Sequence, residues 1–334
     1  MNRRVKEIVA RSLAGKTMEA AEIKQLFSFP AISEESYYIQ YAARILNQEL
    51  NDGLAEVHGQ VGIISGPCPC NCQFCSFAAS NRIFHQQRQE SWENIRKQCL
   101  DLETAGANAI YLMGTAALPF QGFLEIASRV RRQLRPETVM IANIADFGYQ
   151  EALALKAAGL TGVYHALRLG EGQVTRISPA RRRESMQSAR QAGLKLGTCV
   201  EPVGPEHSVD ELVEKTLLTR EMGAVFSGAA RRIDIPGSPL AVHGMSSKAQ
   251  MALTVAVVAL ATGQGVAGNC THEPDITGVM AGASLLWAES GSNPRDTCEA
   301  TENHRGFSVS RCMEIFREAE VEVWSGPSRL FNGR

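Results

Sequence analysis

Short apolar runs alternate with amphipathic stretches along most of the chain after residue 57. The runs at 58–66, 108–114 and 138–146 are apolar on successive positions, which predicts strands buried on both faces. The stretches 91–106 and 119–134 carry apolar residues at helical spacing. The same alternation predicts helices at 149–159, 182–193, 209–223, 246–262 and 308–319, and strands at 162–169, 195–204, 224–235, 265–271 and 283–289.

A strand and a helix that alternate this many times are typical of a parallel sheet with helical crossovers. We therefore expect an α/β fold, and within it a TIM-type (β/α) barrel, complete or partial, rather than an open doubly wound sheet. In such a barrel the loops that follow the strands carry the chemistry.

The first 57 residues instead predict helices. Ser33, followed by Glu34 and Glu35, has the composition of a helix start, and Asn51-Asp52-Gly53 that of an end. No Pro/Gly/Ser-rich linker interrupts the chain. We expect an N-terminal helical extension at 1–57, a barrel core at 58–240, and a part at 241–334 that completes the barrel and covers the site.

Composition narrows the class of protein. A net charge of -1 gives no reason to expect a nucleic-acid or anionic-membrane partner. The most apolar segment, 251–262, is shorter than the roughly 20 residues that a spanning helix needs, so it predicts a buried core helix. No signal-peptide pattern begins the sequence, and we expect a cytoplasmic protein.

Four of the nine cysteines lie at 68, 70, 72 and 75, directly after the first predicted strand of the barrel. Gly66, Pro67 and Pro69 disfavour a regular helix there, so the segment predicts a loop that can aim several thiols at one centre. Thiolates favour zinc or iron–sulfur clusters. A structural zinc site normally needs a second Cys or His pair, and Cys298, His304 and Cys312 lack the usual spacing.

Three thiolates on a 4Fe-4S cube leave one iron open to an outside molecule. The spacing Cys68-x3-Cys72-x2-Cys75, with Phe74 before the last cysteine, resembles the radical S-adenosylmethionine (SAM) superfamily. The resemblance implies that the open iron binds SAM, and that one electron splits SAM into a 5′-deoxyadenosyl radical. That radical would abstract hydrogen from an unactivated C–H bond. A zinc site and a plain electron-transfer cluster remain alternatives.

Cys70 lies inside the x3 gap, where the superfamily motif requires no ligand. It is either a bystander or a sacrificial ligand.

The helices ahead of the first strand, the run YHALRLGEG and the run AGLKLGTCVEPVGPE are similar to the biotin synthase branch, which includes methylornithine synthase and hydrogenase-maturase relatives. This resemblance implies that Met113, Gly114 and Thr115 lie near the SAM amino group, although they depart from the usual Gly-Gly-Glu. It implies contacts to ribose and methionine from Arg168 and Glu171, and to the SAM carboxylate from Arg182. Further candidates at predicted strand ends are His165, Glu201, His272 and Glu273.

Arg181, Arg182 and Arg183 start a predicted helix, where the helix dipole disfavours cations. Either they form a solvated helix start, or one of them pairs with a carboxylate or phosphate, which arginine binds in a bidentate way.

Biotin synthase itself fits poorly, because its second cluster is held by cysteines on barrel strands. Here Cys199 is the only thiol expected on such a strand. Cys270, Cys298 and Cys312 either converge on an auxiliary cluster, as in sulfur-inserting enzymes of the lipoyl synthase kind, or are small buried apolar residues.

Three functions follow. The first is a radical SAM transferase of cofactor biosynthesis that abstracts hydrogen from an unactivated C–H bond of a small or carrier-bound substrate, with sulfur insertion as one possible outcome. The second is a methylornithine synthase-like rearrangement with one cluster. The third is a non-enzymatic zinc or redox-cluster protein. For the enzymes we expect a reducing partner such as flavodoxin or ferredoxin.

Overall fold

Eight parallel strands close into a barrel in the computed structural model, which describes residues 1–297 and 307–333. In ring order they are β1 (Leu54–Gly62), β4 (Ala109–Met113), β5 (Val139–Asn143), β6 (Gly162–Tyr164), β7 (Lys195–Gly197), β9 (Phe226–Arg231), β10 (Gly268–Thr271) and β11 (Leu285–Ser290). The short β8 (Val200–Val203) follows β7 and pairs with β9. Because β11 pairs with β1 and β9 with β10, the ring is complete, and the predicted TIM-type barrel is confirmed.

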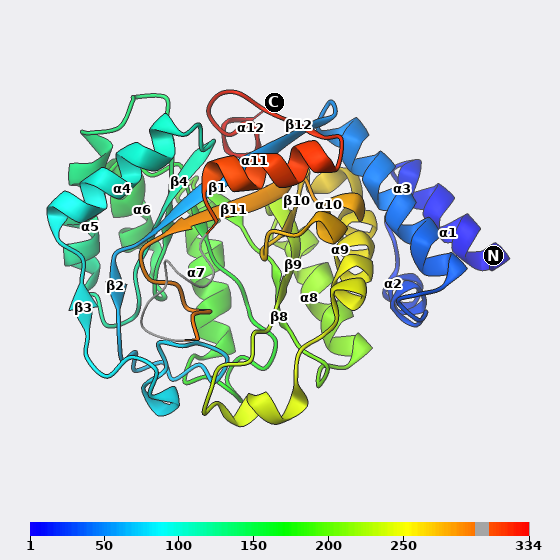
Figure 1. Cartoon of the computed structure of the whole chain (residues 1–334), viewed down its shortest axis with the longest axis horizontal. Coiled ribbons are helices and arrows are strands. Elements are labelled where there is room, and N and C mark those ends of the chain that lie inside the picture. The colour runs from blue at the N-terminus through cyan, green and yellow to red at the C-terminus, as the bar shows by residue number, and fades with distance from the viewer. Residues whose placement is uncertain (298–306, 334) are drawn as a thin grey trace.

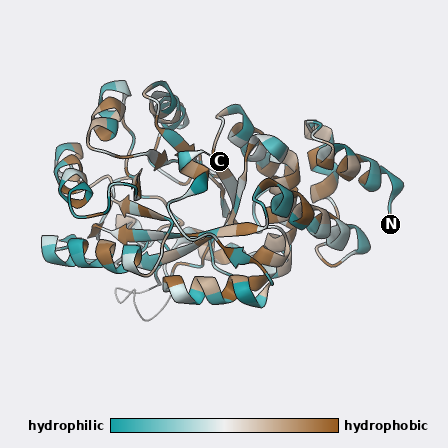
Figure 2. Ribbon diagram, turned by 90° about the horizontal axis from the view of Figure 1, so that it is seen from above, coloured by the Kyte–Doolittle hydropathy of each residue, from teal (hydrophilic) through white to brown (hydrophobic). Residues whose placement is uncertain are grey.

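Helices surround the barrel and turn their apolar faces toward it (Figures 1 and 2). They are α4 (Trp92–Thr104), α5 (Phe120–Arg131), α6 (Tyr149–Ala157), α7 (Pro179–Gln191), α8 (Val209–Glu221), α9 (Lys248–Thr262), α10 (Ile276–Met280) and α11 (Val309–Glu318). Residues alternate along each strand, so Ile110 and Leu112 pack in the cluster under the helices and Tyr111 in the cluster inside the barrel. Two cores therefore stabilise the barrel, one on each side of its wall.

The predicted core helix 251–262 is confirmed as part of α9, in which every residue from Met251 to Thr262 is buried. A helix that is apolar all round needs cover on all sides. The N-terminal helices α1 (Arg3–Leu13), α2 (Ala20–Phe27) and α3 (Glu34–Leu50) share one apolar cluster with α9 and lie beside it in Figure 1. Ser33 caps α3 as expected, because its side chain accepts a hydrogen bond from the Ser36 amide.

The first barrel strand begins at Leu54, earlier than the predicted start at residue 58. Asp52 and Gly53 both have positive φ, so the chain turns tightly and enters the sheet at once. The apolar pattern that predicts a strand is weak at this start because Glu56, His58 and Gln60 are polar, although all three side chains are buried. Their partners lie inside the barrel: His58 Nδ1 is 3.0 Å from the Tyr111 hydroxyl, and Asn143 donates to Gln60.

The chain after residue 319 closes the amino-terminal end of the barrel. It forms β12 (Glu322–Val323), which pairs with β1, and α12 (Arg329–Asn332). Phe331 packs inside the barrel, where a Cβ on Gly162 would come within 2.7 Å of its ring. Glu56 accepts hydrogen bonds from the Ser328 hydroxyl and the Arg329 amide, which holds α12 in place.

The loops after the strands gather at the opposite end, along the lower edge of Figure 1. They include the hairpin of β2 (Ile64–Ser65) with β3 (Arg88–Gln89) and the 3-10 turns η1 (Ala79–Asn81) and η2 (Pro239–His243); a third turn, η3 (Gly263–Gly265), follows α9. Within the described part of the chain, no helix combines the length and apolarity needed to cross a bilayer.

Candidate cluster and cofactor site

One cavity of about 1060 Å³ opens at the carboxyl ends of the strands, counting the solvent space at its mouth. This is large enough for more than one small molecule. The sulfur-bearing residues Cys68, Cys70, Cys72 and Cys75 all line it. The sequence prediction that these thiols lie together at the functional end of the barrel is therefore consistent with the geometry.

Backbone hydrogen bonds close the cysteine loop on itself. Cys68 N–H donates to the Phe77 carbonyl at 2.7 Å, and Cys75 N–H donates to the Cys72 carbonyl at 2.9 Å. The side-chain amide of Asn81 also donates to the carbonyls of Gln73 and Cys75 at 2.9 Å each. The loop has no helix between Gly66 and Ala78, as Pro67 and Pro69 predicted, and it is held by specific bonds.

The thiols differ in their environments. A hydrogen bond from the Cys70 thiol lowers the pKa of Cys68 to about 6, and the same contact raises the pKa of Cys70. Burial raises the pKa of Cys72 to about 11 and that of Cys75 further. Burial disfavours the deprotonated thiolates. An iron–sulfur cluster binds cysteines as thiolates, so cluster binding would oppose this effect of burial.

The donor set fits a 4Fe-4S cluster, since several thiols face one cavity without a charged residue between them in the loop. No three His, Cys, Asp or Glu side chains of the described chain are arranged to hold a single metal ion.

Most of the residues expected near SAM line the same cavity. Phe74 comes from the cysteine loop. Met113, Gly114 and Thr115 lie at the end of β4, Arg168 follows β6, Arg182 is in α7, and Glu201 is in β8. Glu171 does not line the cavity and lies behind it. Its carboxylate accepts from the Thr175 hydroxyl at 2.8 Å and the Arg168 amide at 3.2 Å. A direct contact from Glu171 to a ligand is therefore not supported by the geometry, and its position is that of a support for Arg168.

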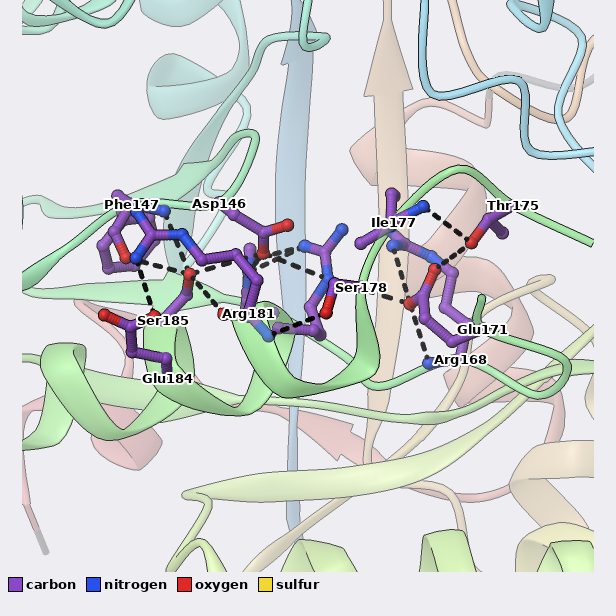
Figure 3. A network of polar contacts seen from close by, with 12 residues as sticks. Asp146, Phe147, Arg168, Glu171, Thr175, Ile177, Ser178, Arg181, Glu184 and Ser185 are labelled. Atoms are coloured by element: carbon purple, nitrogen blue, oxygen red, sulfur yellow. Dashed lines mark hydrogen bonds and ion pairs between the residues drawn. The ribbon is translucent and has the colours of Figure 1, made fainter. Parts of the chain in front are cut away.

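Arg182 is the buried member of the arginine triplet, with 3% of its surface exposed. It lies in the first turn of α7, which Ser178 caps. Figure 3 shows Ser178, Arg181 and Ser185 at this helix start, with Asp146 nearby. Arg182 Nη1 lies 2.7 Å from His165 Nε2, and its Nε lies 3.3 Å from Asp146 Oδ1. Arg181 and Arg183 instead form ion pairs with Glu184 and Glu214 near the surface. The cation that the helix dipole disfavours is thus compensated by buried partners.

The charges in this network constrain one another. Burial, and then Arg182, lower the pKa of His165 to about 3, so the ring is neutral. Burial alone would raise the pKa of Asp146, but its bond with His165 and the charge of Arg182 lower it. Burial also opposes the charge of Arg168, yet Glu171 and Glu201 raise its pKa overall. Burial and the charge of Arg168 lower the pKa of Arg182, although Asp146 and Glu171 oppose this. A guanidinium keeps its proton in proteins, so both arginines present positive charge to the cavity.

The sequence did not predict most of the other residues that line the cavity. They include Gln60, Asn143, Arg231, Arg232 and Arg295. The available signal was a polar residue inside or just after an apolar strand, as at Gln60.

Of the other strand-end candidates, Glu201 and His272 line the cavity. Tyr164, which also lines it, donates to Glu201 at 2.6 Å. His165 lies behind Arg182, and Glu273 pairs with Arg231 at 2.7 Å.

The expectation that Cys199 is the only strand thiol is wrong, and Cys199 itself lies between β7 and β8 rather than on a strand. Cys270 lies on β10, and its sulfur is 2.7 Å from that of Cys199 inside the barrel. Cys312 is on α11 on the other side of the barrel wall, where its thiol donates to the Trp287 carbonyl. Cys270 and Cys312 are therefore not brought together, because the sheet separates them. Cys298 and His304 lie outside the described residues.

The fold and the cavity define a class of barrel enzyme with a thiol-rich loop after the first strand. No family model matches the chain. A biotin synthase from Desulforudis audaxviator is 23% identical over 298 residues, covering 84% of this chain and 89% of that protein. A biotin synthase from Rippkaea orientalis is 28% identical over 201 residues, covering 54% of this chain and 53% of that protein.

Solved structures share the fold at lower identity. The hydrogenase maturase HydG from Carboxydothermus hydrogenoformans aligns with a TM-score of 0.77 at 16% identity, over 95% of this chain and 78% of HydG. Methylornithine synthase (PylB) aligns with a TM-score of 0.75 at 14% identity, over 97% of this chain and 98% of PylB. The chain is therefore distantly similar in sequence to biotin synthases, and it shares its barrel fold with HydG and methylornithine synthase.

Proposed function

We propose that Cys68, Cys72 and Cys75 hold a 4Fe-4S cluster and that the enzyme uses it with SAM to abstract hydrogen from an unactivated C–H bond. The substrate is a small or carrier-bound molecule. The observation that carries this proposal is the single cavity that these three cysteines share with Arg168 and Arg182. When bound, the cluster and SAM supply a one-electron cleavage that yields the 5′-deoxyadenosyl radical.

The residues of the chain would hold and orient these groups. Arg182, with its charge fixed by Asp146 and Glu171, would pair with the SAM carboxylate. Arg168, positioned by Glu171 and Glu201, would contact the ribose or the methionine part. Met113, Gly114, Thr115 and Phe74 would form the wall around the SAM amino group and the cluster, and Glu201 would contribute an acceptor on the far side of Arg168.

A reaction that needs one cluster is supported better than sulfur insertion. Cys270 and Cys312 lie on opposite sides of the barrel wall, which does not suit a shared auxiliary cluster. A rearrangement like that of methylornithine synthase, or another hydrogen abstraction without a sulfur donor, is consistent with this arrangement. The required electron would come from a flavodoxin or ferredoxin type of partner.

Iron and sulfide analysis after anaerobic reconstitution tests this proposal. About four irons per chain support one cluster, whereas about eight would support an auxiliary cluster and sulfur insertion. With dithionite and SAM, the protein should release 5′-deoxyadenosine. A protein that binds zinc only and releases none would contradict the proposal.

A further inference from the structure

The wall of the cavity is positively charged beyond what SAM requires. Arginines at five positions line it: Arg168, Arg182, Arg231, Arg232 and Arg295. Among the described residues that line it, Glu201 is the one carboxylate. The other carboxylates that pair with these arginines are Asp146, Glu171, Glu206, Asp234, Glu273 and Glu289, and none of them lines the cavity. Guanidinium groups therefore face the occupant, and the acids that balance them lie behind.

Two of these arginines already use most of their donors in contacts to carboxylates and backbone carbonyls. Arg232 donates to Glu206 through Nε and Nη2, at 2.7 and 3.1 Å, and to Asp234 through Nη1 at 3.2 Å. Arg231 contacts Glu273 through both Nε and Nη2 at 2.7 Å, and Nη1 donates to the Ser246 carbonyl at 3.4 Å. Their contacts fix the wall and leave little donor capacity for a ligand.

Arg295 differs from them. Its Nη2 donates to Glu289 Oε1 at 2.8 Å, while its buried Nη1 has no hydrogen-bond partner among the described residues. A buried donor without an acceptor is unfavourable, so a ligand that supplies an acceptor there would be favoured. The side chain is 12% exposed and belongs to the wall of the cavity.

His272 lies on the other side of the same Glu289 oxygen. Its Nε2 is 3.7 Å from Oε1, its Nδ1 is buried without a hydrogen-bond partner, and its ring stacks on Trp287 at 5.0 Å. Burial and the charge of Arg295 lower the pKa of His272 and keep the ring neutral. The subsite thus offers one cation and one neutral hydrogen-bonding nitrogen.

The position of Arg295 separates it from the arginines proposed for SAM. Arg168 and Arg182 follow β6, the fourth strand of the ring, whereas Arg295 follows β11, the eighth. In a closed ring of eight strands these ends face each other. The Arg295 loop is also held against the cysteine loop, because Ser76 donates to the carbonyls of Asn293 and Pro294.

We propose that Arg295 anchors the acid group of the substrate, with His272 beside it, and that the substrate is a small organic acid with an apolar body. The apolar body follows from the wall between the two positive poles, which carries Met113, Ile144, Ala230 and Ile233. This inference names the substrate class for the proposed function and rests on it for the reaction only.

A matched series of probes tests the substrate class. Butanoate, hexanoate and octanoate would be compared with hexanol and hexylamine by calorimetry on the full chain, with and without reconstituted iron. We expect acids of at least one length to bind and the alcohol and amine to bind at least roughly tenfold more weakly. Arg295→Gln should remove the preference for acids, and Arg295→Lys should restore part of it. Arg132→Gln, a change of an exposed arginine at the end of α5, should behave like the unaltered protein.

Three results would overturn the inference: equal binding of hexanol or hexylamine, unchanged binding of acids by Arg295→Gln, or no binding of any acid in the series. Loss of acid binding in Arg182→Gln alone would also overturn it, because it would place the acid at the SAM pole. If the protein binds the acids but takes up no cluster when it is reconstituted with iron and sulfide, the proposed function is refuted and the acid site remains.

Discussion

The guanidinium of Arg182 lies against the imidazole of His165, with Nη1 2.7 Å from Nε2, and Asp146 Oδ1 lies 2.9 Å from the same ring nitrogen. The three groups come from the loop after β5, the end of β6 and the first turn of α7. Their contacts hold one buried cation in the wall of the cavity that the cysteines also line. Two of the predictions below concern this network.

Replacing Arg182 by Ala should weaken SAM binding by at least about tenfold, because a buried carboxylate partner and a charged ligand both lose their cation. Isothermal titration of the anaerobic, reconstituted protein with SAM measures this. Arg181→Ala is the matched control: that residue is a near neighbour in α7 but pairs with Glu184 near the surface. Equal SAM affinity of Arg182→Ala and the unaltered protein would remove Arg182 from the site.

The stability of the protein should fall as the pH is lowered from 6.5 toward 3, in part because of His165. Its pKa is about 3 when folded, against 6.5 when unfolded, so the unfolded chain binds more protons in this window. At pH 5 the loss from this residue is of the order of 2 kcal/mol. Urea unfolding at pH 7.5 and pH 5 should therefore show a smaller pH difference for His165→Gln. An unchanged difference would mean that His165 is not held neutral in the fold.

The cysteines of the loop should not be equivalent. Cys68→Ala, Cys72→Ala and Cys75→Ala should each lose iron and stop 5′-deoxyadenosine formation, because a cube with two protein ligands is poorly held. Cys70→Ala should retain both properties. Iron content and chromatographic detection of 5′-deoxyadenosine measure the series. Loss in all four variants would show that Cys70 is a ligand or is needed to position Cys68.

Phe331 should be essential for the amino-terminal closure of the barrel. Its ring is 1% exposed, so Phe331→Ala should lower the free energy of unfolding by about 3–5 kcal/mol. Tyr37→Ala removes an aromatic side chain that is 60% exposed and should change stability by no more than about 0.5 kcal/mol. If chemical denaturation gave both variants the same free energy of unfolding, α12 would not stabilise the amino-terminal end of the barrel.

The barrel and the position of the cysteine loop could be predicted from the sequence because both depend on local pattern. Apolar runs separated by helical periodicity specify the crossovers, and Pro67 and Pro69 specify a loop. The relation between Cys199 and Cys270 could not be predicted, since it depends on β9 lying between β7 and β10. Phe331 was missed for a similar reason: four residues of helix in a polar tail have no periodic signal, and their burial is decided by Glu56.

The site was predictable only where charge and local structure conflicted. Three arginines at a helix start required partners, and Arg182 has them. Arg295 gave no such signal, because its loop has no regular structure and its partner Glu289 lies at the end of an apolar strand.

The central claim is that the cysteine loop leaves one iron of a cluster open and that SAM binds there. Electron paramagnetic resonance of the dithionite-reduced, anaerobic protein tests it most directly. We expect a 4Fe-4S signal whose line shape changes when SAM is added, and a smaller change in Arg182→Ala at the same SAM concentration. A cluster signal that SAM leaves unaltered would contradict the account.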